Sequence, residues 1–245
     1  VIMRVTNSES NTSIAEIGDN IYRISTPVPP NPALPAGFSF NQFLIVDDEP
    51  LLFHTGLRGM FPLVREAIEA VIPVGTLRYL GISHFEADEC GALNELLEVA
   101  PQAVPLCSAI AKMVSVDDVA DREALGLGDG EQLSLGKHVV QWIDTPHLPH
   151  GWDCGYLFEQ KTSTLFCGDM FTQPGAEHRP LIEGDILGPS EAMRDAMDYY
   201  AHTENTGQLI AKLAATEPTT LACMHGSSWS GNGSELLGQL AAALD

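Results

Sequence analysis

Four times along this chain a short apolar run, of the kind that forms a buried strand, is followed within a few residues by a histidine or a carboxylate. Loops that leave one edge of a sheet converge on one cleft, so this pattern constrains both the fold and the place of a functional site. It predicts a sheet-based fold with polar side chains gathered at one edge. The residues that follow the four runs are His84, His150, Asp169 and His225.

The first run leads into a dense polar cluster. Residues 83–93 read SHFEADECGAL, with His84, Glu86 and Asp88 at alternating positions. In an extended segment every second side chain points to the same side, about 7 Å apart, so three coordinating groups would face one spot. The alternative is a solvated loop in which Asp88 or Glu89 begins the next helix, where a carboxylate interacts favourably with the helix dipole. The cluster alone leaves both interpretations open.

Apolar periodicity changes along the chain in a way that indicates a mixed α/β fold. Ile21–Ile24 and Phe43–Val46 predict antiparallel strands, whereas Met60–Val71 has apolar residues at helical spacing. Two halves that each run from strands to helices predict two sheets face to face with helices outside, in a single domain over residues 1–245. Further strands are predicted at Leu51–Phe53, Leu77–Ile82, Glu131–Leu135, His138–Ile143, Tyr156–Phe158 and Ser163–Cys167, and helices at Cys90–Val99, Ser190–Ala201, Glu204–Ala215 and Ser234–Leu244.

Composition excludes several classes of partner. The chain carries 12 basic and 33 acidic residues, and the formal net charge of −21 repels phosphate backbones and anionic lipid surfaces. Nucleic acid and membranes are therefore not expected as partners. The five cysteines include no C-x-x-C pair, and no apolar run reaches the roughly eighteen residues of a membrane span. We expect a cytoplasmic protein with reduced thiols.

Four sequence blocks, taken in order, resemble the metallo-β-lactamase superfamily. They read HFEAD, TPHLPHGWDCG, LFCGD and MHG, against a superfamily pattern of H-x-H-x-D-H, T-P-G-H, G-D and a final G-H or H-G. The similarity extends from about Ile17 to Gly226. Glu86, at the second histidine of the pattern, resembles the flavodiiron branch, whose motif is H-x-E-x-D. The resemblance implies a four-layer αββα sandwich, the metallo-β-lactamase fold, with a two-metal site at the sheet edge.

The resemblance implies a set of six metal ligands, three imidazoles and three carboxylates. Such an oxygen-rich set suits non-haem iron or manganese better than zinc, although affinity order alone does not exclude zinc. We expect two iron ions with a bridging oxo or hydroxo group, and manganese or zinc as alternatives. Carried over residue by residue, His84, Glu86 and His150 would hold one metal, Asp88 and His225 the other, and Asp169 would bridge them.

Some residues depart from the family pattern and are candidates for hydrogen bonds to the ligands. Glu89 stands where the superfamily has the histidine of D-H, so the second metal either gains an oxygen ligand there or keeps a water. The alternative is an exposed glutamate in the first turn of a helix. His54 replaces the aspartate of D-T-G and is either structural or a hydrogen-bonding group. Asp153 is expected to line the pocket. His147 competes with His150 in the third block, but His150 alone has the family's spacing to the following residues, which leaves His147 at the rim.

The resemblance also implies a class of function. Flavodiiron enzymes attach a flavodoxin-like domain that binds FMN, whereas this chain ends about twenty residues after His225, so no FMN is expected. The stand-alone oxygen-binding di-iron proteins of the superfamily are the closer resemblance. We expect a di-iron centre that binds dioxygen, with or without reducing it, as a sensor, store or scavenger. Its partners would be dioxygen or another diatomic molecule and a separate electron donor or signalling protein.

Alternatives of different chemistry stay open at this point. A di-zinc hydrolase would attack a lactone, thioester or related ester with a bridging hydroxide. A binding module with structural metals is a third reading, and a ligand set with open positions argues against it. The sequence does not decide whether the chain is an enzyme. If it is one, an oxygen or nitric oxide reductase is expected first and a metal-dependent hydrolase next. Whether the chain forms a homodimer is also open.

Overall fold

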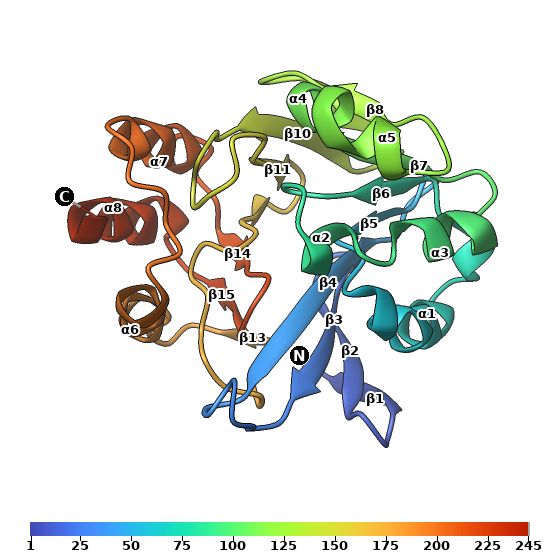
Figure 1. Ribbon diagram of the computed structural model, residues 1–245, viewed down its shortest axis with the longest axis horizontal. Coiled ribbons are helices and arrows are strands. Elements are labelled where there is room, and N and C mark those ends of the chain that lie inside the picture. Colours follow the sequence, from blue (N-terminus) through green and yellow to red (C-terminus); the bar gives the residue numbers. More distant parts are fainter. Residues whose placement is uncertain (245) are drawn as a thin grey trace.

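Two β-sheets pack face to face, with helices on both outer sides (Figure 1). The computed structural model describes residues 1–244. This four-layer αββα arrangement confirms the predicted fold class. The first sheet, in chain order, contains β1 (Met3–Asn7), β2 (Thr12–Gly18), β3 (Ile21–Val28), β4 (Phe38–Ile45), β5 (Leu51–Phe53), β6 (Tyr79–Gly81), β7 (Val104–Ser108) and β8 (Leu125–Leu127).

The second sheet is built from the later part of the chain in the order β13-β15-β14-β12-β11-β10-β9. Both β10 and β12 are antiparallel to β11, which lies between them, so they run in the same direction, and β14 is parallel to β12. The carboxyl ends of β10, β12 and β14 therefore lie at one edge of the sheet. The strands are β9 (Gln132–Ser134), β10 (Val139–Asp144), β11 (Gly155–Glu159), β12 (Thr164–Phe166), β13 (Leu181–Ile182), β14 (Thr220–Ala222) and β15 (Ser228–Ser230).

Helices form the two outer layers, as Figure 1 shows with α1 and α3 on one side and α6 to α8 on the other. In α1, Val64, Ala67 and Ile68 are buried at helical spacing, and a proline stands in its first turn. The helices are α1 (Phe61–Glu69), α2 (Ala87–Cys90), α3 (Leu93–Val99), α4 (Ala109–Ala111), α5 (Asp117–Val119), α6 (Leu187–Met197), α7 (Thr206–Ala214) and α8 (Gly233–Leu244).

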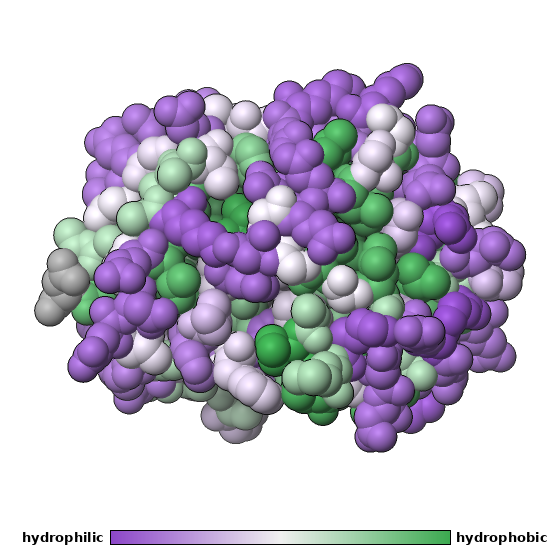
Figure 2. All heavy atoms as spheres, turned by 90° about the horizontal axis from the view of Figure 1, so that it is seen from above, coloured by the Kyte–Doolittle hydropathy of each residue, from purple (hydrophilic) through white to green (hydrophobic). Residues whose placement is uncertain are grey.

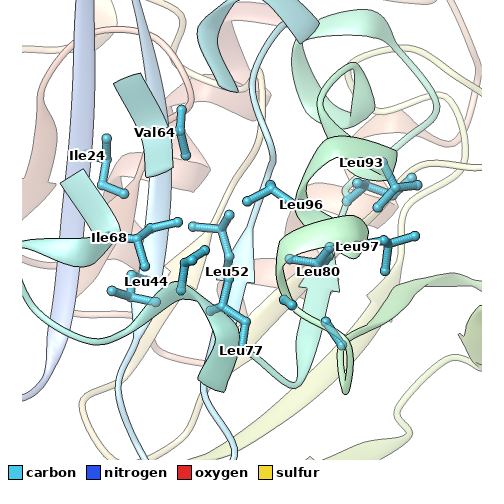
Figure 3. Close-up of a cluster of buried hydrophobic side chains, with 14 of the residues drawn as sticks. Ile24, Leu44, Leu52, Val64, Ile68, Leu77, Leu80, Leu93, Leu96 and Leu97 are labelled. Carbon is cyan, nitrogen blue, oxygen red and sulfur yellow. The ribbon is translucent and has the colours of Figure 1, made fainter. Parts of the chain in front are cut away.

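Three apolar layers hold these elements together. Phe43 and Phe53 from the first sheet meet Phe166 from the second, with ring centroids 5.6 Å apart in both pairs. Figure 3 shows the layer beneath α1 and α3, where Ile68 and Leu96 face the strands of the first sheet. Full burial of one such side chain contributes about 1.5–3 kcal/mol. The apolar layer between the two sheets therefore holds them together.

Two predicted helices differ from the structure. The segment predicted as Cys90–Val99 starts earlier and is divided into α2 and α3 at Gly91, where a Cβ would come within 2.8 Å of the Arg58 backbone nitrogen. The helix predicted over Ser190–Ala201 ends at Met197, because Asp198 adopts the left-handed conformation with φ of 48°. The strands β1, β2, β7, β8, β13 and β15 were not predicted.

The face of the molecule in Figure 2 is mainly hydrophilic, with polar side chains over most of it and apolar areas between them. Within residues 1–244, no helix combines the length and the apolar character that crossing a membrane requires.

Candidate metal centre

The loops that leave both sheets bring all six predicted ligands to one place. The first sheet contributes the segment after β6, which includes the short helix α2. The second sheet contributes the loops after β10, β12 and β14, whose carboxyl ends share an edge. The side chains that meet there are His84, Glu86, Asp88, His150, Asp169 and His225.

Four of these side chains form a first group around one point. Glu86 Oε2 lies 2.9 Å from His84 Nε2 and 3.0 Å from His150 Nε2. Asp169 Oδ2 lies 3.3 Å from His150 Nε2 and 3.6 Å from His84 Nε2. One ligand atom from each residue is within 4.8 Å of the others. Two imidazole nitrogens and two carboxylate oxygens in this arrangement can surround a single cation.

A second group uses the other oxygen of the same aspartate. His225 Nε2 lies 3.3 Å from Asp169 Oδ1 and 3.3 Å from Asp88 Oδ2. Asp169 is therefore placed between the two groups and offers one oxygen to each. A carboxylate in this position can bridge two cations, as the sequence resemblance implies for Asp169.

The histidines are fixed by hydrogen bonds on the side away from the centre. His150 Nδ1 lies 2.8 Å from the Tyr199 carbonyl oxygen, and His225 Nδ1 lies 2.8 Å from that of Ser39. Since a carbonyl oxygen can only accept, each Nδ1 donates and each Nε2 points to the centre. A ligand whose second nitrogen is held in this way has a fixed tautomer and ring orientation.

His84 is held through a chain of side chains that includes His54. Ser83 Oγ lies 3.0 Å from His84 Nδ1 and 3.0 Å from His54 Nε2, and His54 Nδ1 lies 2.9 Å from Met224 Sδ. Burial lowers the pKa of His54 to about 3, so its imidazole is neutral. His54 thus reaches a predicted ligand through Ser83, whose position next to His84 was the only signal of this role in the sequence.

Glu89 is buried, so its interpretation as an exposed helix residue is wrong. Its side chain has no accessible surface, and neither carboxylate oxygen has a hydrogen-bond partner. Burial and the nearby Asp169 carboxylate raise the pKa of Glu89 well above its usual value. Asp169 Oδ1 also lacks a hydrogen-bond partner. Buried carboxylate oxygens without partners are costly, and cations at this place would satisfy them, so the residues fit a metal centre.

The two remaining predicted residues differ in position. Asp153 is buried, and its Oδ2 accepts a hydrogen bond of 2.9 Å from the Phe85 N–H, between two predicted ligands. Asp153 therefore braces the segment after β6. His147 is exposed, and its backbone N–H donates to the Gly151 carbonyl at 2.8 Å. The structure does not bring the His147 imidazole into contact with the six ligands.

In the metal-free protein the carboxylates retain protons on the imidazoles. Burial opposes the charged form of His150, but the carboxylates of Asp169 and Glu86 outweigh it and raise the pKa of His150 to about 10. Asp169 and Asp88 likewise raise the pKa of buried His225 to about 9. The hydrogen bond from His150 lowers the pKa of Glu86 to about 2. The centre therefore collects positive charge, either as protons or as metal ions.

A small cavity of about 160 Å³ opens onto the centre. Its other walls are mostly apolar, and the Phe38 ring packs against the His225 ring at a tilt of 31°, with centroids 4.3 Å apart. Most of these wall residues come from β4, from α6 and from the segment after α6, far from the ligand blocks, so the sequence did not indicate them. Thr172 is the exception, because it follows Asp169 in the loop after β12. The wall residues are Phe38, Thr172, Met193, Met197 and Tyr199.

The αββα sandwich is that of the metallo-β-lactamase class of protein, and the two groups of predicted ligands lie at its edge. Within this class, the family described as ODP family beta lactamase matches residues 38–226. The chain belongs to this family, and the matched range includes all six predicted ligands.

Curated relatives are longer proteins. A putative diflavin flavoprotein A 1 of Nostoc is 27% identical over 211 residues, which cover 80% of this chain and 35% of the relative. An anaerobic nitric oxide reductase flavorubredoxin of Aliivibrio fischeri is 26% identical over 220 residues, covering 83% and 42%. The chain thus spans less than half the length of these relatives.

Solved structures share the fold over nearly the whole chain. A metal-soaked flavodiiron core from Synechocystis superposes with a TM-score of 0.80 at 20% identity, covering 95% of this chain and 60% of that one. A fragment of a putative diflavin flavoprotein A 5 from Nostoc gives 0.78 at 17% identity, covering 95% and 96%. These comparisons confirm the predicted resemblance to the flavodiiron branch.

Proposed function

We propose that residues 1–245 form one metallo-β-lactamase-like domain that holds a non-haem di-iron centre, binds dioxygen there and reduces it with electrons from a separate donor. The observation that carries this proposal is the position of Asp169, which offers Oδ2 to one ligand group and Oδ1 to the other. This arrangement favours two cations over one.

The choice of iron rests on the chemistry of the ligands. Glu86 supplies an oxygen 2.9–3.0 Å from two imidazole nitrogens, where the wider superfamily pattern has a histidine that suits zinc. Carboxylates together with imidazoles and open positions are typical of non-haem iron sites. The names of the relatives, a flavodiiron core and a nitric oxide reductase, support the same class of chemistry.

The walls of the cavity favour a small substrate. Its volume of about 160 Å³ is below the roughly 300 Å³ of ordinary ligand pockets, and Phe38, Met193 and Met197 line it with apolar surface beside the centre. Burial raises the pKa of the half-buried Tyr199 hydroxyl, which stays protonated at neutral pH and donates to the Asp169 carbonyl oxygen at 3.4 Å. The carbonyl of Tyr199 orients His150. When bound, two ferrous ions supply electrons to a diatomic ligand.

The experiment is anaerobic purification followed by metal analysis and exposure to gas. We expect two iron ions per chain and a change in the near-ultraviolet spectrum when dioxygen is admitted. A chemically reduced flavin then serves as the donor while an oxygen electrode records consumption. A parallel titration with nitric oxide compares the two diatomic ligands. Equal or faster turnover of nitric oxide would assign the centre to nitric oxide reduction instead.

A hydrolase gives the opposite set of results. Two tightly bound zinc ions, no spectral response to either gas, and turnover of a lactone or thioester would refute the di-iron proposal. The variant Glu86→His provides a check on metal choice, because it restores the histidine of the wider superfamily pattern. Its iron content is expected to fall in favour of zinc; unchanged iron content and oxygen response would contradict our account of selectivity.

A further inference from the structure

Glu89 lies beside the centre but is not one of the six predicted ligands. It lies in α2, next to Asp88, and its backbone is fixed because the Thr55 N–H and hydroxyl both donate to its carbonyl oxygen, at 2.7 and 3.1 Å. The carboxylate itself is fully buried with neither oxygen hydrogen-bonded. The main chain of Glu89 is thus anchored, while its side chain has no protein partner.

The surroundings of Glu89 make this burial costly. The charged groups that face it are Asp88 on its own helix, Asp169 from the loop after β12, and His84 from the segment after β6. Oxygens of Glu86, Asp88 and Glu89 lie within 4.8 Å of one another. Among residues 1–244, no ion pair links Glu89 to a lysine, arginine or histidine. Carboxylates that face one another repel unless a cation lies between them, and the repulsion is strongest at the fully buried Glu89.

We propose that Glu89 is a fourth carboxylate ligand of this centre, bound to the second cation beside Asp88 and His225, and that it makes the two metal positions chemically unequal. The inference rests on the binuclear centre proposed above. The first position has two imidazoles and two carboxylates, counting the shared Asp169. The second position has one imidazole and three carboxylates.

This inequality has a direct consequence for metal choice. Imidazole ligands suit zinc and iron, whereas carboxylates favour harder cations such as Mn²⁺. The second position is therefore more favourable to Mn²⁺, relative to Zn²⁺, than the first. Four carboxylates also balance the charge of two divalent cations without a hydroxide bridge. Substitution of Glu89 is expected to change occupancy and selectivity at the second position while the first position keeps its four ligands.

The competing explanation is that Glu89 is a neutral carboxylic acid that donates a hydrogen bond to Asp88. The variant Glu89→Gln separates the two explanations, because an amide has nearly the same shape and can still donate but is a poor metal ligand. Glu89→His restores the residue of the family pattern, which can bind a metal as a neutral nitrogen ligand. Glu98→Gln is the matched control, since it removes one carboxylate from an exposed position on the neighbouring helix α3.

The test uses metal-free protein equilibrated with Mn²⁺ alone, and then with equal concentrations of Mn²⁺ and Zn²⁺. Bound metal is counted by mass spectrometry, and Mn²⁺ coordination is followed by electron paramagnetic resonance. The wild type and Glu98→Gln are expected to bind two ions. Glu89→Gln is expected to bind the second ion at least about 100-fold more weakly, more than the loss typical of an outer hydrogen-bonding group. Glu89→His is expected to bind two ions with a bound Mn²⁺ to Zn²⁺ ratio at least tenfold below that of the wild type.

Two results would overturn the proposal. One is a Glu89→Gln protein that is folded by circular dichroism and binds two ions with the wild-type Mn²⁺ to Zn²⁺ ratio. The other is an unchanged ratio in Glu89→His, which decides the matter if Glu89→Gln does not fold. If the wild type binds two ions, neither result contradicts the proposal of a binuclear centre. A wild type that binds fewer than two ions refutes the centre itself, and the role of Glu89 with it.

Discussion

Metal binding to the metal-free protein is expected to release at least three protons per chain at pH 7.5. The pKa values of about 10 for His150 and about 9 for His225 lie 2.5 and 1.5 units above this pH. Since each unit is a factor of ten, His225 is about 97% protonated and His150 more so. The pKa of His84 is raised as well. All three imidazoles must lose a proton before their nitrogens can bind metal.

The coupling between metal binding and proton release also determines how metal affinity and stability depend on pH. Three released protons raise the overall constant for loading two ions by roughly a thousandfold for each pH unit up to about pH 9. A raised histidine pKa stabilises the metal-free protein below pH 6.5, and this stability is lost as pH rises through about 9 to 10. The metal-free protein is therefore expected to be less stable at pH 10 than at pH 7.

The assay is calorimetric titration of metal-free protein with Mn²⁺ in two buffers of different ionisation enthalpy, which counts released protons directly. The control is Asp169→Asn, in which the carboxylate 3.3 Å from both His150 and His225 becomes neutral. Its histidine resonances, followed by nuclear magnetic resonance, are expected to titrate closer to pH 6.5. Release of fewer than two protons by the wild type would refute the electrostatic reasoning, whatever metal the centre prefers.

Other variants test the supports of the centre and the fold. Ser83→Ala removes the hydroxyl that holds His84 and is expected to lower affinity for the first metal about 10- to 100-fold, measured by chelator competition; unchanged affinity would contradict the role. Gly168 has a φ of 46°, and Gly168→Ala places a Cβ within 2.7 Å of the Tyr156 ring. Urea denaturation is therefore expected to show a loss of about 1–3 kcal/mol in the free energy of unfolding, and a loss near zero would contradict this strain. Leu80→Ala, in the layer of Figure 3, is expected to cost about 2–5 kcal/mol with the denaturant slope unchanged; a cost under about 1 kcal/mol would show that the layer collapses around the gap.

The parts of the fold that were predicted carry a local signal. The helix α1 has apolar residues at helical spacing, and the buried strands β5 and β6 are continuous apolar runs. The strand β7 lacks such a signal, because Pro105 stands inside it and a proline ordinarily argues against a central strand. Its pairing with β6 comes from tertiary packing, which no short window of sequence contains.

The candidate site likewise contains residues that the sequence could predict and residues that it could not. The six predicted ligands stand in recognisable blocks, so their gathering followed from sequence order and from the tendency of loops at one sheet edge to converge. Glu89 could not be placed, since the first turn of an isolated helix does not say which side faces the protein. Its burial depends on the loop at Thr55, thirty-four residues earlier in the chain. The Tyr199 carbonyl that orients His150 gives no side-chain pattern at all.

The ligands of each proposed cation come from loops of both sheets, and this affects how long a bound metal stays. The segment after β6 is joined to the second sheet by the Gly155 N–H, which donates to the Ser83 carbonyl at 2.9 Å. Asn41 of β4 in turn donates to the carbonyl of Gly226, beside His225, at 2.8 Å. No single side-chain rotation frees a cation held in this way. Metal exchange is therefore expected to be slow, with a lifetime set by transient separation of the sheet edges rather than by the strength of any one bond.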